Sequence, residues 1–261
     1  MSNLHTTRRS LKQQLRGRAR LFGGWTSFGH PSITEIIARS GVDFMAIDME
    51  HSTMGLFDAQ QIIVSSQSLG VPCLPRPVSH GIEMIKPMLD SGADGLIAPM
   101  VSTPEELRRL VNLLKFPPAG RRSFGVARAH GYGFYFDAYV SGWNESSPFI
   151  IQIETVEGVE NIDQLLQFEE VDGVMIGPYD LSGSLGVPGQ PDHLLVREAA
   201  HTVVEACARY KKSCGTQIAA VDRQKIDEAF AAGYTFIILS SDLFVLWQWS
   251  AVMKELIKEH R

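Results

Sequence analysis

The chain alternates eight times between strand-like and helix-like segments, and this alternation restricts its fold more than any other feature. Short runs rich in β-branched and aromatic residues are each followed by a stretch in which apolar residues return with helical period. The predicted strands are Leu21–Trp25, Phe44–Asp48, Cys73–Arg76, Gly95–Pro99, Phe149–Ile153, Gly173–Ile176, Gly215–Ile218 and Thr235–Leu239. The predicted helices are Ile33–Arg39, Ala59–Leu69, Ile82–Asp90, Pro104–Leu114, Val159–Leu166, Leu195–Tyr210, Arg223–Ala232 and Leu243–Ile257.

Several of these strands are apolar along their whole length, as in Phe149–Ile153, which is typical of parallel strands covered by helices. Eight β–α units in 261 residues match the usual size of one α/β barrel. We therefore predict a single (β/α)8 TIM barrel over residues 1–261, with an open, doubly wound sheet as the alternative that uses the same alternation.

Three segments stand outside the strand–helix rhythm. Residues 1–20 form a basic N-terminal segment, expected to be a helix (Leu4, Leu11 and Leu15 on one side) that closes the bottom of the barrel; an organellar transit peptide is the alternative. Residues 116–147 are too long for an ordinary connection, so we expect a lid or a subunit contact. The C-terminal helix carries the aromatic segment 244–249, expected in the core or in an oligomer interface.

Composition narrows the possible partners. A net charge of -5 and a pI near 5.9 give no general attraction to nucleic acid or anionic membranes, which favours a small-molecule substrate. The three cysteines show no CxxC spacing, so a cytoplasmic location is expected. No run reaches the roughly 18 apolar residues of a membrane span.

Polar residues gather at the C-terminal ends of the predicted strands, where barrel enzymes place their active sites. They are Asp48, Glu50, His51, Arg76, Gln152, Glu154, Asp180 and Gln217. Glu154 and Asp180 follow adjacent strands and together suit a hard divalent cation that keeps positions open for water and substrate. The alternative is that these two residues are a helix cap and a surface acid.

Arg76 and His51 are further candidates. Arg76 lies between two prolines at the end of a strand, where a bound carboxylate or enolate would supply its anionic partner, although a structural pair with a barrel acid is also possible. His51 is a candidate base held by the carboxylate of Asp48, three residues earlier, or else a structural histidine.

The absence of certain residue patterns argues against two other kinds of chemistry. No lysine falls in a predicted strand, so a Schiff base inside the barrel is disfavoured. P-loop and G-x-G-x-x-G patterns are missing too, which argues against a nucleotide cofactor.

Over residues 20 to 250 the chain resembles the metal-dependent, class II 2-oxo acid aldolases of the HpcH/HpaI type, which are related to citrate lyase β-subunits. The stretches that carry the resemblance are 44–51, 75–77, 85–90, 97–100, 117–121, 152–154 and 172–182. Ordered matches at so many strand ends are specific to the superfamily, unlike any one of them alone.

The resemblance implies a role for each matching residue. Glu154 and Asp180 would bind Mg²⁺ or Mn²⁺, with Co²⁺ as a further possibility, and Gln152 would support a water on the metal. Arg76 would contact the 2-oxo group, and His51 with Asp48 would handle the proton. The remaining implied residues are Gly177, Pro178 and Tyr179, whose turn would hold the pyruvate carboxylate; Trp25, which would line the pocket; and Asp90, which would reach a neighbouring subunit's site in a trimer or hexamer.

The expected function is therefore cleavage of a 4-hydroxy-2-oxo acid to pyruvate and an aldehyde. A condensing enzyme that uses the same enolate chemistry is the first alternative, and a binding protein on a barrel without activity is the second. The chain departs from the family pattern at Ser123-Phe124, Tyr179, Gln217 and 240–242, which leaves the identity of the aldehyde open.

Overall fold

Eight parallel strands form the central sheet in the computed structural model, which describes residues 2–261 and the side chains from residue 7 onwards. The strands are β1 Leu21–Thr26, β2 Phe44–Asp48, β3 Cys73–Arg76, β4 Leu96–Ala98, β5 Phe149–Ile153, β6 Gly173–Ile176, β7 Ser213–Ile218 and β8 Phe236–Leu239. Their order is β3-β2-β1-β8-β7-β6-β5-β4, and β3 and β4 contact each other, so the sheet is a nearly closed barrel. The predicted (β/α)8 fold is confirmed, and the open-sheet alternative is wrong.

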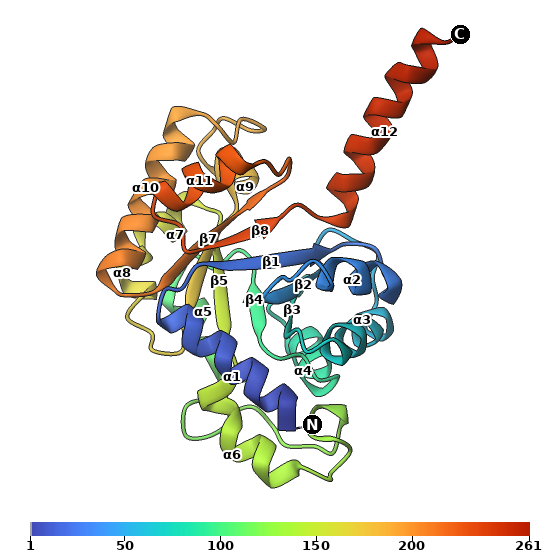
Figure 1. The fold of residues 1–261 in the computed structure, drawn as a ribbon. Helices are drawn as coiled ribbons and strands as arrows, with labels where there is room; N and C mark the ends of the chain where they lie inside the picture. The colour runs from blue at the N-terminus through green and yellow to red at the C-terminus, as the bar shows by residue number, and fades with distance from the viewer. Residues whose placement is uncertain (1) are drawn as a thin grey trace.

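Helices alternate with the strands and surround the barrel (Figure 1). They are α1 Ser2–Arg16, α2 Pro31–Ala38, α3 Leu56–Ser68, α4 Ile82–Asp90, α5 Pro104–Leu114, α6 Phe136–Ser146, α7 Val156–Glu160, α8 Ile162–Leu165, α9 Pro178–Ser184, α10 Leu194–Arg209, α11 Arg223–Ala231 and α12 Asp242–Glu259. Local sequence sets several boundaries. Thr103 caps α5 by accepting a hydrogen bond from the backbone N–H of Glu106, and Gly233 follows α11 with a φ of 98° that favours glycine.

The barrel interior is filled by strand side chains such as Phe44, Phe236 and Ile238, and α1 closes its N-terminal end with Leu11 and Leu15. This confirms the expected position of the N-terminal helix; the side chain of Leu4 lies outside the described residues. The buried carboxylate of Asp172, just before β6, anchors α1 through Lys12 (2.5 Å) and Arg16 (2.7 Å).

Residues 116–147 are not one long loop, because they contain the 3₁₀ turn Arg128–His130 and the eleven-residue helix α6. Trp143 of α6 is fully buried and donates a hydrogen bond to the carbonyl of Leu114, while the guanidinium of Arg8 on α1 stacks over its ring. The helix is therefore stabilised mainly by contacts with α1 and the end of α5, which the local sequence pattern does not reveal.

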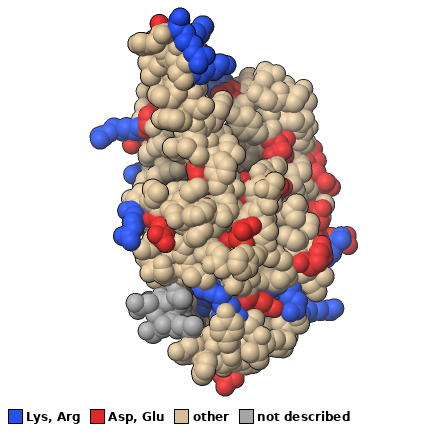
Figure 2. Space-filling view, turned by 90° about the vertical axis from the view of Figure 1, so that its right-hand side faces the viewer, with Lys and Arg blue, Asp and Glu red and all other residues tan. Residues whose placement is uncertain are grey.

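Helix α12 extends away from the barrel after its first turn (Figure 1). Of its residues only Asp242 is buried, and apolar side chains such as Trp247 and Trp249 are more than 60% exposed. Figure 2 shows this helix rising above the barrel, largely uncharged along its length and with charged side chains near its tip. Among the described residues, no helix combines the length and apolar character needed to cross a membrane.

Candidate active site

The C-terminal ends of the strands surround a cavity of about 280 Å³, large enough for a small organic molecule. It brings together ten of the eleven residues proposed from the sequence: Trp25, Asp48, His51, Arg76, Gln152, Glu154, Gly177, Pro178, Tyr179 and Asp180. The eleventh, Asp90, lies at the end of α4 outside the cavity of its own chain, where it pairs with Lys86 (3.0 Å) and Arg122 (3.1 Å).

Glu154 follows β5 directly and is only 2% exposed. Its Oε2 accepts a hydrogen bond from the backbone N–H of Met100 (2.8 Å), and its Oε1 accepts one from the amide of Gln152 (3.2 Å). Burial raises the pKa of Glu154 from an ordinary 4.5 to about 7, and the nearby acids Glu50 and Asp180 act in the same direction. The folded chain alone therefore resists full ionisation of this carboxyl group near neutral pH.

Two backbone features hold this carboxylate in place. Met100 has a φ of 50°, an uncommon conformation for a residue other than glycine, and its N–H donates to Glu154. Gly177, at the end of β6, allows close approach on the other side, because a Cβ atom there would lie only 2.2 Å from Glu154 Oε1. A larger residue at position 177 would therefore force the Glu154 carboxylate to move.

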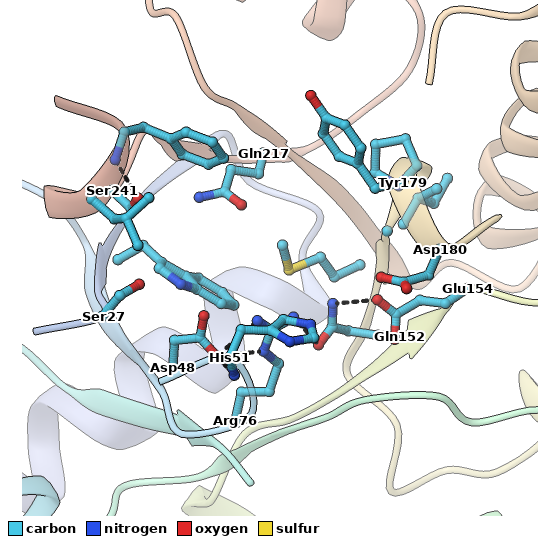
Figure 3. Close-up of a pocket in the computed structure, with 17 residues that line it drawn as sticks. Ser27, Asp48, His51, Arg76, Gln152, Glu154, Tyr179, Asp180, Gln217 and Ser241 are labelled. Atoms are coloured by element: carbon cyan, nitrogen blue, oxygen red, sulfur yellow. Dashed lines mark hydrogen bonds and ion pairs between the residues drawn. The ribbon is translucent and has the colours of Figure 1, made fainter. Parts of the chain in front are cut away.

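Asp180 lies in the first turn of α9 and is exposed to the cavity mouth. Gly177, not Asp180, occupies the N-cap position of α9, so the helix-cap alternative for Asp180 is wrong. Because β5 and β6 are parallel neighbours, Asp180 and Glu154 emerge side by side (Figure 3).

Arg76 forms ion pairs with two acids, Asp48, which lines the cavity, and Glu50, which lies behind the lining. Asp48 and Arg76 are register partners in the β2–β3 pair, and Asp48 Oδ1 accepts hydrogen bonds from Nη2 (2.7 Å) and Nε (3.2 Å) of Arg76. Arg76 Nη1 lies 3.2 Å from Glu50 Oε2 and 3.5 Å from Gln152 Oε1. The guanidinium also stacks on the ring of Trp25, at 4.8 Å from its centroid. These contacts fix a positive charge beside the acids.

His51 is placed differently from the sequence-based expectation. Asp48 Oδ1 accepts the backbone N–H of His51 (3.1 Å) as well as the hydrogen bonds of Arg76, and the acid beside the His51 ring is Glu50 instead. The ring, on a side chain that is 61% exposed, has Nε2 at 3.7 Å from Glu50 Oε2. Asp48 therefore shapes the turn that carries His51, and Glu50 is the acid beside the ring.

The acids at the mouth fit a divalent cation. Glu50 Oε2 is buried without a hydrogen bond, apart from its ion pair with Arg76, and burial raises the pKa of Glu50. Burial raises the pKa of both Glu154 and the half-buried Glu50, and the charge of the exposed Asp180 acts on both in the same direction, so a cation bound here would stabilise the ionised forms of these two acids. Within the part of the chain that the structure describes, no set of three or more His, Cys, Asp and Glu side chains forms a ready-made metal cage. A cation there would keep positions for water and substrate oxygens, as Mg²⁺ commonly does.

Sequence reasoning overlooked several residues of this site. Glu50 was noted at a strand end but given no role, although its place between Asp48 and His51 was a usable signal. Met100 contributes a backbone N–H, which no side-chain pattern marks. Ser27 and Ser241, from the loops that follow β1 and β8, and Phe244, from the first turn of α12, also line the cavity.

Comparison with known proteins identifies relatives along almost the whole chain. Residues 21–248 match the family model described as HpcH/HpaI aldolase/citrate lyase. A 2-keto-3-deoxy-L-rhamnonate aldolase of Salmonella typhi is 34% identical over 235 residues, which cover 88% of this chain and 86% of the relative.

Solved structures agree with these matches. An HpcH/HpaI aldolase/citrate lyase family protein from Burkholderia cenocepacia J2315 superposes with a TM-score of 0.87 at 30% identity, covering 97% of this chain and 99% of that one. The citrate synthase SbnG superposes with a TM-score of 0.82 at 29% identity, covering 96% and 98%.

Proposed function

The chain belongs to the HpcH/HpaI aldolase/citrate lyase family, and from this premise we propose that it is a metal-dependent aldolase acting on a 4-hydroxy-2-oxo acid. The reaction reversibly gives pyruvate and an aldehyde through an enolate. One observation carries the proposal: the buried Glu154, with its raised pKa, lies beside Asp180 and across one cavity from the cation of Arg76.

Glu154 and Asp180 are the proposed metal ligands, with Mg²⁺ or Mn²⁺ as the preferred ions and Co²⁺ as a further possibility. Both residues offer oxygen donors, which these hard cations favour. When bound, the cation supplies Lewis-acid stabilisation of negative charge on the 2-oxo acid. Gln152 positions Glu154 by donating to its Oε1.

Arg76 provides the second charge for the enolate. Its guanidinium is fixed by Asp48 and Trp25, so it need not reorganise when negative charge develops on the substrate oxygen. His51, exposed at the mouth beside Glu50, accepts the proton of the 4-hydroxyl group in the cleavage direction. The Gly177–Asp180 turn binds the pyruvate carboxylate through the backbone N–H groups of Tyr179 and Asp180, because the N–H of Gly177 donates to the carbonyl of Ile153 and Pro178 has none.

A condensing activity is the second candidate, favoured by the similarity to the citrate synthase SbnG. It would use the same type of enolate chemistry, with the acetyl group of an acetyl donor forming the enolate and oxaloacetate as the acceptor. The two candidates separate on incubation with pyruvate plus aldehydes, compared with incubation with oxaloacetate and an acetyl donor. The aldolase proposal expects carbon–carbon bond formation only with the former.

The direct test is exchange of the methyl protons of pyruvate with solvent deuterium, followed by NMR. We expect exchange only with a divalent cation, and exchange that persists after thorough chelation would contradict the metal assignment. Borohydride in the presence of pyruvate should not inactivate the enzyme, whereas a trapped lysine adduct would establish Schiff-base catalysis. Arg76→Ala should reduce exchange at least about a hundredfold, since one lost charge-stabilising donor costs about 3 kcal/mol or more; a wild-type rate would remove Arg76 from the mechanism.

We further propose a homo-oligomer, a trimer or hexamer, in which other copies cover α12. Exposed apolar side chains occur along its whole length, from Leu243 to Ile257. A contiguous apolar surface of this extent marks an interaction site in most proteins. Asp90, outside the cavity of its own chain, would then reach a neighbouring subunit's site.

A cytoplasmic location is also proposed. The three cysteines, Cys73, Cys207 and Cys214, are all buried and free in the structure. Unpaired thiols suit a reducing compartment.

A further inference from the structure

One peptide group after β4 contacts the proposed metal ligand Glu154. It joins Pro99 to Met100, and its N–H donates to Glu154 Oε2 at 2.8 Å. The carbonyl at the other end of this peptide group accepts a hydrogen bond from His80 Nε2, at 2.6 Å. Because a carbonyl oxygen can only accept, His80 carries a proton on Nε2. His80 and Glu154 are therefore linked through the two ends of one rigid, planar unit.

This peptide group is held in an unfavourable orientation. The φ of Met100 is 50°, in the left-handed region, which costs a residue other than glycine about 1–2 kcal/mol. A half-turn of the peptide plane would change this φ by about 180°, to about −130°, which lies in the broad β region. The turned peptide would, however, point its carbonyl oxygen at the Glu154 carboxylate in place of the N–H. Relief of strain at Met100 and the bond to Glu154 therefore oppose each other.

His80 resists that half-turn from outside the lining of the cavity. Its ring is half-buried in the loop between β3 and α4. Turning the peptide group would break the hydrogen bond from His80 to the Pro99 carbonyl. The same bond polarises the peptide group, which strengthens its N–H as a donor to a negatively charged carboxylate. His80 thus both fixes the orientation of this N–H and improves it as a donor.

The rest of this loop is fixed by other contacts. The N–H of Val101 donates to the carbonyl of Gln152 in β5 at 3.1 Å. The N–H of Ser102 donates to the carboxylate of Glu106 at 3.0 Å. Both bonds belong to peptide groups that follow the turned one, so they can persist whichever way it faces. Among these contacts, only the bond from His80 fixes the carbonyl of the peptide group that holds the metal ligand.

We propose that His80 is a positioning residue for the metal site: its hydrogen bond to Pro99 keeps the N–H of Met100 directed at Glu154, and this raises the affinity for a divalent cation. The inference rests on the metal-dependent function proposed above. A carboxylate that binds a cation must be ionised and correctly oriented, and groups that hydrogen-bond to metal ligands supply both conditions. Because His80 lies outside the cavity lining, we expect it to change cation affinity more than the chemical step.

The test measures the dissociation constant of Mn²⁺ for the full chain, from the EPR signal of free Mn²⁺. His80→Leu removes the donor, whereas His80→Gln retains an N–H group near the position of Nε2. Met100→Gly, alone and combined with His80→Leu, removes the steric cost of the left-handed conformation. His201→Leu is the matched control, because the ring of His201 is exposed and pairs with Glu205 of the same helix, α10.

We expect His80→Leu to weaken Mn²⁺ binding about tenfold or more, the effect typical of losing a residue that orients a metal ligand. His80→Gln should retain most of the affinity, and His201→Leu should retain all of it. In the Met100→Gly background, His80→Leu should have a smaller effect, because glycine gains nothing from the half-turn. Pyruvate proton exchange in His80→Leu should fall more at limiting Mn²⁺ than at saturating Mn²⁺.

Unchanged Mn²⁺ affinity in His80→Leu would overturn the inference, as would an equal loss in His80→Gln or an undiminished loss in the Met100→Gly background. In each of those cases, metal-dependent exchange by the wild type would leave the aldolase proposal intact. Absence of Mn²⁺ binding by the wild type would overturn both the inference and the proposed metal site.

Discussion

Replacing Glu154 by glutamine should make the metal-free protein more stable at pH 8 while abolishing metal binding. The carboxyl group is buried, and its pKa is raised from 4.5 to about 7, so ionising it in the folded chain costs free energy that the unfolded chain does not pay. Glutamine keeps the shape of the side chain and an oxygen for the N–H of Met100, but carries no charge.

The magnitude follows from the pKa. Each unit of pKa is worth about 1.4 kcal/mol, so the ionised Glu154 destabilises the metal-free fold by about 3 kcal/mol above pH 7. The new amide nitrogen faces the amide of Gln152, and we subtract about 1 kcal/mol for that hydrogen bond. Glu154→Gln should therefore raise the free energy of unfolding by about 2 kcal/mol at pH 8.

The sign of the pH dependence is fixed by the raised pKa. Between pH 4.5 and about 7 the folded state binds more protons at Glu154 than the unfolded state, so this residue makes wild-type stability fall as pH rises through that window. Above pH 7 its contribution is constant. The advantage of Glu154→Gln should consequently be full at pH 8 and disappear near pH 5.

Urea unfolding with a chelator, at fixed protein concentration and several pH values, measures this difference. Added Mn²⁺ should stabilise the wild type and leave Glu154→Gln unchanged. Asp180→Asn is the matched control, because Asp180 is exposed and is the smallest of the contributions that raise the pKa of Glu154: it should lose the Mn²⁺ effect and gain much less stability in the metal-free state than Glu154→Gln. Parallel pH curves for the wild type and Glu154→Gln would refute the reasoning, as would stabilisation of Glu154→Gln by Mn²⁺.

Two further predictions concern the ends of the barrel. Lys12→Met should lower the free energy of unfolding by about 2–3 kcal/mol in urea at pH 7, because it leaves the buried Asp172 with Arg16 as its remaining ion-pair partner. Lys115→Met should cost less than about 1 kcal/mol, since Lys115 has only neutral hydrogen-bond partners and burial lowers its pKa; equal losses would contradict this reading. Trp247→Glu, on the exposed face of α12, should shift the mass measured by light scattering towards the monomer, and an unchanged mass would show that this face is not an interface.

The strands could be predicted well from the sequence because buried strands consist of uninterrupted apolar residues. The strand β5, Phe149–Ile153, is buried at every position, so an uninterrupted apolar run marks both its extent and its type. Helix α6 has no comparable apolar pattern in the sequence. Its buried residues Tyr139 and Trp143 pack against Arg8, which lies more than a hundred positions earlier in the chain. Without knowledge of that contact, the many glycine and tyrosine residues of the segment suggested a loop.

For the active site, too, the sequence predicted the positions of residues but not their contacts. Strand ends predicted which residues would meet in the cavity, because parallel strands in a barrel bring their C-terminal ends to one edge. Pairing within the cavity depended on register: Asp48 lies opposite Arg76 across β2 and β3, and this contact leaves the His51 ring to Glu50. The short separation along the chain favoured a contact between Asp48 and the His51 ring. No residue pattern in the sequence reveals that Asp48 pairs instead with Arg76 on the neighbouring strand.

The free-energy cost at Glu154 and the proposed chemistry have the same origin. A carboxyl group exposed to water is ionised at neutral pH even without a cation. Binding a cation would therefore stabilise its ionised form less than it stabilises that of the buried Glu154. In the folded protein Glu154 is buried against Gly177 and lies near Glu50, so its ionised form is poorly solvated. A bound divalent cation would stabilise that negative charge. The same dry surroundings strengthen the interaction of Arg76 with an enolate.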